Sequence, residues 1–230
     1  MTTRPSSRKT YPAEVLTPAE VQALINACSP KSATGIRNRA LLTFLYRSGL
    51  RISEAIGYPG RPEQEIARPD GGEKIQAARP PISPLKVSDV NLDSHSIRLQ
   101  HTKSGEAQTR GFHPSATDAL ARWMDVRRQL GLNGRQALFC TLRGEPLSEQ
   151  YVRAFLGRLA AKADITKRIH PHALRHTFAV ELETGKAPVT IISKLLGHSS
   201  IAVTSRYLDH LSNGEAVTFL EGAELPALED

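Results

Sequence analysis

Alternation of apolar and polar residues, the pattern of a half-buried β-strand, is confined to one short part of this 230-residue chain. Residues 86–90, 96–102 and 107–113 alternate in this way, and Ser104 and Gly105 supply turn residues between the last two segments. These segments predict a small three-stranded antiparallel sheet. Elsewhere the apolar residues recur at helical spacing, so the predicted fold is mainly α with this one small antiparallel β-sheet, an α+β architecture.

Residues typical of helix ends delimit the predicted helices. Thr17, Pro18 and Glu20 have the spacing of a capping box with proline in the first turn, and Gly49 suits the position just after a helix. Another helix is expected to begin near Arg51. The remaining helical segments cover about residues 17–28, 36–48, 115–130, 148–162, 171–184 and 189–196, with shorter candidates at 201–207 and 215–220.

Residues 58–84 interrupt this pattern. They contain six prolines and three glycines but few large apolar residues, which predicts a long exposed loop or insertion. The segment has no net charge, because four basic residues are balanced by four acidic ones. We therefore do not expect it to act as a simple electrostatic clamp on a polyanion. The basic residues are Arg61, Arg68, Lys74 and Arg79, and the acidic residues are Glu63, Glu65, Asp70 and Glu73.

The formal net charge of the chain is +7, and its distribution is uneven. Residues 211–230 contain five acidic residues and no Lys or Arg, which leaves +12 over residues 1–210. A basic body favours a polyanionic partner, with nucleic acid the leading candidate and a merely solvated basic surface the alternative. We expect a flexible basic lead-in over residues 1–12 and an acidic tail over 211–230 that is helical in part.

Several other classes of protein are disfavoured. No apolar run approaches the roughly 18 residues of a membrane span, and the start of the chain lacks the apolar core of a signal peptide, so we expect a cytoplasmic protein with no membrane partner. Cys28 and Cys140 do not suit a disulfide framework or a paired-cysteine zinc site. His172 and His176 share a helical face, but Ala173 stands where a zinc protease has its glutamate. We expect no metal and no cofactor.

Five short motifs in a fixed order carry the functional prediction. Together they resemble the tyrosine recombinase (phage integrase) family, over a region from about Leu16 to His210. The motifs are residues 49–54 (GLRISE), 101–105 (HTKSG), 170–178 (HPHALRHTF), 196–200 (LGHSS) and 204–210 (TSRYLDH). The resemblance implies the fold of a tyrosine recombinase catalytic domain over residues 13–210. It also implies a catalytic set of Arg51, Lys103, His172, Arg175, His198 and Tyr207.

The chemistry of these residue types agrees with that resemblance. Cutting a DNA phosphodiester without metal needs a nucleophile, positive charge on the phosphate oxygens and an acid for the leaving oxygen. Arginine suits the second task, because its planar guanidinium binds two phosphate oxygens and stays charged. Arg51 and Arg175 are therefore expected to stabilise the charge that builds in the transition state, with His198 adding a hydrogen bond.

The resemblance makes Tyr207 the nucleophile. A free tyrosine has a pKa near 10, so it needs a positive site and a base, and His172 is the candidate base. Lys103, at the turn between two predicted strands, is the candidate acid for the leaving 5′ oxygen, with Lys86 and Lys74 as competitors. The product would be a 3′-phosphotyrosyl link that a second DNA hydroxyl can reverse without ATP. His176 is expected to be a structural residue that supports the arginine helix.

The predicted function is site-specific recombination of double-stranded DNA: integration, excision or inversion. The resemblance implies a homotetramer in the DNA synapse and leaves open a partner recombinase. Alternatives are a type IB topoisomerase, a catalytically silent DNA-binding regulator and a metal-dependent nuclease. Family members usually carry a separate N-terminal DNA-binding domain, so the chain is either a fragment or a naturally short member. The acidic tail is expected to pack either on its own domain or on a neighbouring protomer.

Overall fold

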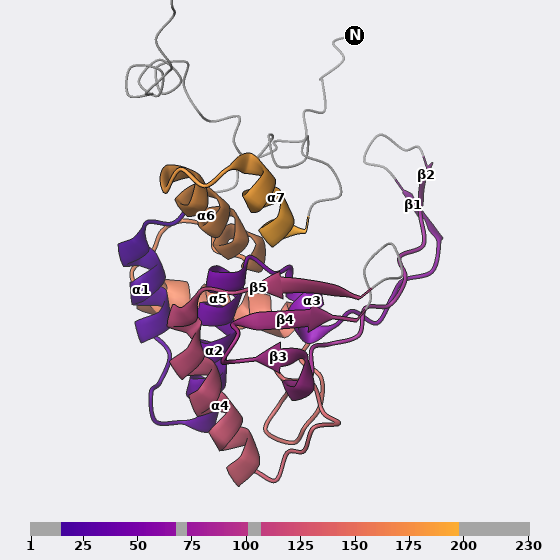
Figure 1. Cartoon of the computed structure of the whole chain (residues 1–230). Coiled ribbons are helices and arrows are strands. Elements are labelled where there is room, and N and C mark those ends of the chain that lie inside the picture. Colours follow the sequence, from indigo (N-terminus) through magenta and orange to yellow (C-terminus); the bar gives the residue numbers. More distant parts are fainter. Residues whose placement is uncertain (1–14, 68–72, 101–106, 198–230) are drawn as a thin grey trace, which may run out of the picture.

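The computed structural model describes residues 15–67, 73–100 and 107–197. Helices are the main secondary structure of this part of the chain, beside one three-stranded sheet and a separate two-stranded hairpin (Figure 1). The architecture confirms the predicted fold class. The α-helices are α1 (Pro18–Asn26), α2 (Ala33–Ser48), α3 (Ile52–Ile56), α4 (Thr117–Gln129), α5 (Glu149–Lys162), α6 (Pro171–Thr184) and α7 (Val189–Leu196). Two 3₁₀ helices are η1 (Val87–Asp89) and η2 (Pro114–Ala116).

Helix α2 is the centre of the hydrophobic core. It packs against α1, α4 and α6, and the side chains of Leu41, Leu42, Phe44 and Leu45 are fully buried. Burial of a side chain of this size contributes about 1.5–3 kcal/mol, so this one helix holds its three neighbours together. The candidate site lies just beyond its C-terminal end.

Gly49 ends α2 and brings α6 and α7 close to it. Its φ of 62° lies in the left-handed region, and its N–H donates to the Leu45 carbonyl. A Cβ atom at this position would lie 2.7 Å from a Phe178 ring carbon and 2.9 Å from a Leu196 methyl carbon. Glycine is therefore required both for the turn and for the close approach, and the prediction that Gly49 follows a helix is confirmed.

Other predicted helix ends are also confirmed. The Thr17 hydroxyl accepts a hydrogen bond from the Glu20 N–H, and the Glu20 carboxylate accepts one from the Thr17 N–H, which completes the capping box of α1. Helices α6 and α7 have their predicted bounds. The candidate helices at 201–207 and 215–220 lie outside the described residues, as do the lead-in and the acidic tail.

The three-stranded sheet is shorter than predicted. Strands β3 (Val90–Asn91), β4 (Ser96–Leu99) and β5 (Gln108–Gly111) pair antiparallel in the order β3-β4-β5. The prediction of a strand over residues 86–90 is wrong, because most of that segment forms η1. The Asp89 carboxylate accepts a hydrogen bond of 2.8 Å from the Lys86 N–H, which closes a turn in place of a ladder.

The prediction of a long loop over residues 58–84 is also wrong in part. Strands β1 (Gln64–Ala67) and β2 (Glu73–Gln76) form an antiparallel hairpin, which projects from the body beyond the end of the sheet where β4 ends and β5 begins (Figure 1). Tyr58 pairs with Ile82 and Arg61 with Arg79, each through two backbone hydrogen bonds. Three prolines, Pro59, Pro80 and Pro81, lie between these pairs, and Pro62 directly follows Arg61. None of the four takes part in these backbone hydrogen bonds, so they are compatible with the paired backbone.

Two features of the described residues bear on the classes of protein that composition disfavoured. None of the helices there is both long enough and apolar enough to cross a membrane. Cys28 and Cys140 are buried thiols that form no disulfide. Burial raises the pKa of the Cys28 thiol to about 11, so this side chain stays protonated in the core.

Candidate active site

Arg51 lies at the junction between α2 and α3, two residues after Gly49. It occupies the N-cap position of α3, and 42% of its side-chain surface is exposed to solvent. The Glu54 carboxylate accepts hydrogen bonds from the Arg51 backbone N–H (2.7 Å) and from its guanidinium Nη1 (3.1 Å). Glu54 therefore fixes both ends of this arginine while leaving part of the guanidinium accessible to a ligand.

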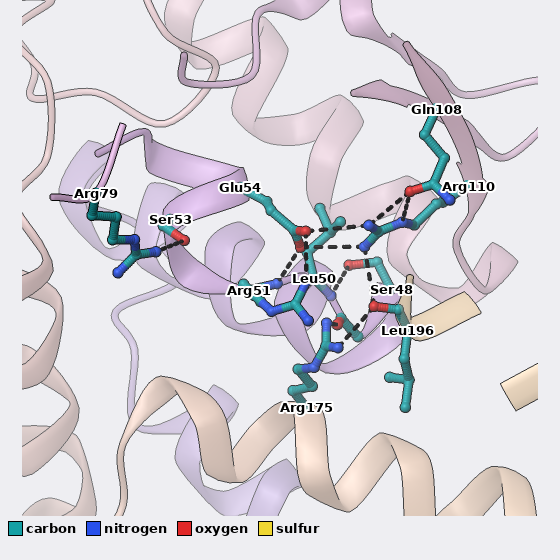
Figure 2. Close-up of polar contacts among 11 residues, drawn as sticks. Ser48, Leu50, Arg51, Ser53, Glu54, Arg79, Gln108, Arg110, Arg175 and Leu196 are labelled. Atoms are coloured by element: carbon teal, nitrogen blue, oxygen red, sulfur yellow. Dashed lines mark hydrogen bonds and ion pairs between the residues drawn. The ribbon is translucent and has the colours of Figure 1, made fainter. Parts of the chain in front are cut away.

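Arg175, on α6, is fully buried. Its Nη1 donates to the Gly49 carbonyl (2.5 Å) and its Nη2 to the Leu196 carbonyl (2.7 Å), as Figure 2 shows for the second of these. The first acceptor ends α2 and the second ends α7. One guanidinium thus joins three helices at the point where three of the sequence motifs meet.

Arg110, on β5, binds α3 and α7 from the side of the sheet. Its guanidinium donates to both Glu54 carboxylate oxygens (3.2 and 3.3 Å), to the Gln108 side-chain oxygen (2.9 and 3.0 Å) and to the Leu196 carbonyl (3.3 Å). Burial lowers the pKa of Arg110, and the negative charge of Glu54 opposes that shift. Glu54 therefore sits between Arg51 and Arg110, and Leu196 is bound by both Arg110 and Arg175 (Figure 2).

Gly197 explains why Arg110 fits so closely. Its φ of 61° ends α7 in the left-handed region, and a Cβ there would lie 1.9 Å from Arg110 Nη2. The guanidinium occupies the space that any larger residue would need. Glu54, Gln108 and Arg110 were not predicted to belong to the site. Glu54 carried a weak signal, since it lies three residues after Arg51 on a helix, but a buried arginine in a strand carries none.

His172 lies one turn before Arg175 on α6 and is exposed at the surface. Partial desolvation and the positive charge of Arg175 together lower its pKa to about 4, with smaller contributions in the same direction from His170, His176 and Arg51. The imidazole is therefore neutral at pH 7 and can accept a proton. The ring stacks on that of His170 with 6.3 Å between centroids.

His170 and His176 support α6 rather than extending the predicted catalytic set. The His170 ring nitrogen Nδ1 accepts a hydrogen bond of 3.2 Å from the Ala173 N–H, so this histidine caps the helix. His176 is buried at 3% exposure, which agrees with the structural role predicted for it. The next residue, Thr177, accepts a hydrogen bond from the Leu16 N–H and joins α6 to the start of α1.

Three residues of the predicted catalytic set, Lys103, His198 and Tyr207, lie outside the described residues. The structure describes the strands on either side of Lys103: β4 ends at Leu99 and β5 begins at Gln108. Of the predicted set, the structure thus brings Arg51, His172 and Arg175 into one cluster. Across residues 15–67, 73–100 and 107–197, no group of three or more His, Cys, Asp or Glu side chains gathers as metal ligands do.

Comparison with known proteins identifies relatives that match most of the described residues. A sequence profile of the phage integrase family matches residues 14–58 and 82–213. The tyrosine recombinase XerD of Ralstonia nicotianae is 31% identical over 196 residues, a match that covers 84% of this chain and 55% of XerD. The tyrosine recombinase XerC of Bacillus licheniformis is 32% identical over 192 residues, covering 82% and 54%. The chain spans little more than half the length of these relatives.

Solved structures share the fold. The crystal structure of XerA recombinase superposes with a TM-score of 0.69 at 23% identity, covering 94% of this chain and 67% of XerA. The Tn1549 transposon integrase, in complex with circular intermediate DNA, gives a TM-score of 0.65 at 22% identity, covering 92% and 66%. The profile matches most of the chain, including the segments that meet at Arg51, Arg175 and Leu196, and this chain therefore belongs to the phage integrase family.

Proposed function

We propose that this chain is the catalytic domain of a site-specific recombinase that cuts and rejoins double-stranded DNA without metal or ATP. The observation that carries the proposal is the junction made by Arg175. Its two hydrogen bonds, to Gly49 and Leu196, bring together the first residues of two motifs that are far apart in the sequence. One motif contains Arg51 and the other contains His198. A cluster of arginines built around a single shared carboxylate, Glu54, has excess positive charge and favours an anion such as a DNA phosphate.

Arg51 and Arg175 act on that phosphate in different ways. Arg51 is accessible and already fixed by Glu54, so its planar guanidinium can bind two phosphate oxygens with little loss of entropy. Arg175 is buried, so in this structure its charge acts on a bound phosphate through the poorly solvated surroundings, where electrostatic interactions are stronger than in water. Direct contact with a phosphate requires its guanidinium to become accessible.

His172 is the proposed base. Its low pKa leaves it neutral, but it also makes the free imidazole a weak base. The singly charged DNA phosphodiester beside Arg51 and Arg175 offsets their positive charge, which raises the pKa of His172 towards its usual value. The base thus becomes stronger when DNA occupies the site, and the tyrosine is activated only there.

Tyr207 is the proposed nucleophile. Two other tyrosines, Tyr46 and Tyr151, have hydroxyl groups already engaged in hydrogen bonds away from the arginine cluster. The Tyr46 hydroxyl donates to Glu181, and burial with that hydrogen bond raises the pKa of Tyr46 to about 12. The Tyr151 hydroxyl accepts a hydrogen bond of 2.6 Å from buried Arg37. Both side chains hold the core together.

The proposed covalent step moves the DNA phosphate from the 5′ oxygen to Tyr207. The Tyr207 hydroxyl loses its proton to His172 and attacks the phosphorus, a P–O bond to tyrosine forms, and the bond to the 5′ oxygen breaks. Lys103, which follows β4 and precedes β5 in the sequence, gives its proton to that leaving oxygen, and His198 donates to a phosphate oxygen. Rejoining is the reverse reaction with a second DNA 5′ hydroxyl, so the bond energy is kept.

The wider organisation is part of the same proposal. Residues 13–210 form the catalytic domain, residues 58–84 are an insertion, and four copies act on two DNA sites, alone or with a partner recombinase. The profile match stops at residue 58 and resumes at residue 82, which supports the insertion. The unpaired thiols of Cys28 and Cys140 suit a reducing cytoplasm, where the DNA substrate lies.

A nicked suicide duplex tests the proposal. Such a substrate loses a short fragment after cleavage, so rejoining is blocked and the covalent complex accumulates. We expect the wild-type chain to form a 3′-linked adduct in excess chelator, and Tyr207→Phe to bind the duplex but form no adduct. Cleavage that needs metal, or adduct formation by Tyr207→Phe, contradicts the proposal.

Replacing the bridging 5′ oxygen by sulfur tests the acid. A thiolate leaves without a proton, so the sulfur substrate removes the need for an acid. We expect Lys103→Ala to cleave the normal duplex roughly 10²–10⁴ times more slowly and to recover on the sulfur substrate. Arg51→Ala serves as the matched control and should stay impaired on both. Equal recovery of the two variants, or of neither, contradicts the role of Lys103.

A further inference from the structure

The insertion places one arginine against the helix that begins at Arg51. Arg79, on the returning arm of the insertion, donates from its Nη2 to the Ser53 hydroxyl at 3.2 Å (Figure 2). Its guanidinium also lies over the Tyr58 ring, with Cζ 4.2 Å from the ring centroid. Ser53 is buried, whereas Arg79 is exposed. Both contacts hold the guanidinium at the base of the hairpin, two residues along α3 from Arg51.

These contacts leave most of the binding capacity of Arg79 unused. A guanidinium has five N–H donors, and the bond to Ser53 uses one of them. Arg79 forms no ion pair with any carboxylate among the described residues. The guanidinium is therefore charged, oriented and still able to bind an anion.

The position of Arg79 is a property of this chain rather than of its family. The family profile matches residues 14–58 and 82–213, so Arg79 lies outside it, while Ser53 and Tyr58 lie inside. Residues 58–84 carry no net charge, so composition gives no reason to expect a DNA contact there. The backbone pairing of Arg61 with Arg79 nevertheless brings the Arg79 side chain back onto α3.

We infer that Arg79 binds a phosphate of the DNA backbone beside the phosphate that Arg51 binds. The inference rests on the proposed DNA-cleaving function. Stacking on Tyr58 and the bond to Ser53 restrict the guanidinium before DNA arrives, which reduces the entropy lost on binding. The insertion thus adds a single phosphate contact next to the cleavage site and does not act as a general clamp.

The salt dependence of DNA binding tests this inference. Neutralisation of one duplex phosphate contributes about 0.9 to the slope of log K against log salt concentration. We expect Arg79→Ala to reduce that slope by about 0.9 and to weaken binding at low salt roughly tenfold, the equivalent of one charge-assisted hydrogen bond. Its thermal unfolding midpoint should stay close to that of the wild type, because the side chain is exposed.

Arg61→Ala is the matched control. It removes the same charge from the same hairpin, but the Arg61 guanidinium is directed at the opposite arm, where it donates to the Ala77 carbonyl, whereas Arg79 is held against α3 beside Arg51. We expect its salt slope to equal that of the wild type. Equal reductions in both variants would show a general charge effect, and a lower unfolding midpoint with an unchanged slope would show a purely structural anchor; either result overturns the inference. If the wild type itself forms no adduct with the suicide duplex, the proposed function fails instead.

Discussion

Two arginines of this molecule are held in opposite ways. Arg175 is buried, and its hydrogen bonds to the Gly49 and Leu196 carbonyls join α2, α6 and α7. Arg51 is 42% exposed and is fixed by one neighbouring carboxylate, that of Glu54. The buried arginine is a part of the fold as well as of the site, whereas the exposed one can be removed with the fold intact. We therefore expect substitution of Arg175 to lower both stability and activity, and substitution of Arg51 to lower activity alone.

The largest effect is expected for Arg175→Ala. The change removes the guanidinium donor of the Gly49 carbonyl, leaves the Leu196 carbonyl with Arg110 as its remaining guanidinium donor, and opens a cavity where the side chain was. Hydrogen bonds from a charged group are worth about 1.5–3 kcal/mol each, so we expect the free energy of unfolding to fall by about 3–5 kcal/mol. Denaturant unfolding measures this, together with loss of DNA cleavage. A stable but inactive Arg175→Ala protein would contradict the structural role of Arg175 and leave it equivalent to Arg51.

A smaller loss is expected for Gly197→Ala. The new Cβ would lie 1.9 Å from Arg110 Nη2 at a φ of 61°, so Arg110 must move away from Glu54 and Leu196. We expect destabilisation of about 1–3 kcal/mol and reduced cleavage. Gly157→Ala on α5 is the control: nothing lies within 4 Å of its Cβ, and alanine there should stabilise the helix by about 0.5–1 kcal/mol. Similar losses for both would show that the contact with Arg110 is unimportant.

The pH dependence of His172 gives an effect of intermediate size. Its folded pKa of about 4 lies below the ordinary value of 6.5, so the unfolded chain binds more protons between these pH values. Its contribution to stability is therefore present above pH 6.5 and is lost as the pH falls towards 4. We expect His172→Gln to lessen this acid sensitivity. NMR titration of the ring should also show a higher pKa in the DNA complex than in the free protein.

The smallest effect on stability is expected for Arg51→Ala. An exposed ion pair is worth about 0–1 kcal/mol, so thermal unfolding should hardly change. Cleavage should nevertheless fall by at least about 10²-fold, the usual cost of one lost donor to a transition-state charge. A large fall in the unfolding midpoint of this variant would show that Arg51, like Arg175, stabilises the fold, and would contradict the difference between the two arginines.

The sequence predicted most of the helical frame, because caps and glycine stops are local signals. Thr17, Glu20 and Gly49 behave as their residue types suggest. The hairpin of the insertion was missed because its pairing, Tyr58 with Ile82 and Arg61 with Arg79, joins residues far apart among prolines that disfavour strands. The strand predicted over residues 86–90 failed because Asp89 bonds to the Lys86 backbone in a turn.

The candidate site also contains residues that the sequence predicts and residues that only the tertiary structure reveals. Arg51, His172 and Arg175 came from motifs that can be recognised in the sequence, and the structure brings them together. The residues that hold them in place, such as Arg110, could not be predicted from the sequence. Arg110 reaches Glu54 and Leu196 only because β5 is packed against the end of α7, which is a property of tertiary packing. The low pKa of His172 likewise depends on neighbours that the fold supplies.

The central claim is that Tyr207 carries the covalent link to DNA. The most direct measurement is mass spectrometry of the adduct trapped on a suicide duplex, digested with trypsin and nuclease. Residues 207–230 contain no Lys or Arg and a single tyrosine, so the account predicts one nucleotide-bearing peptide from this region, modified at Tyr207. A nucleotide on a peptide that contains Tyr151, Tyr46 or Tyr58 would contradict it.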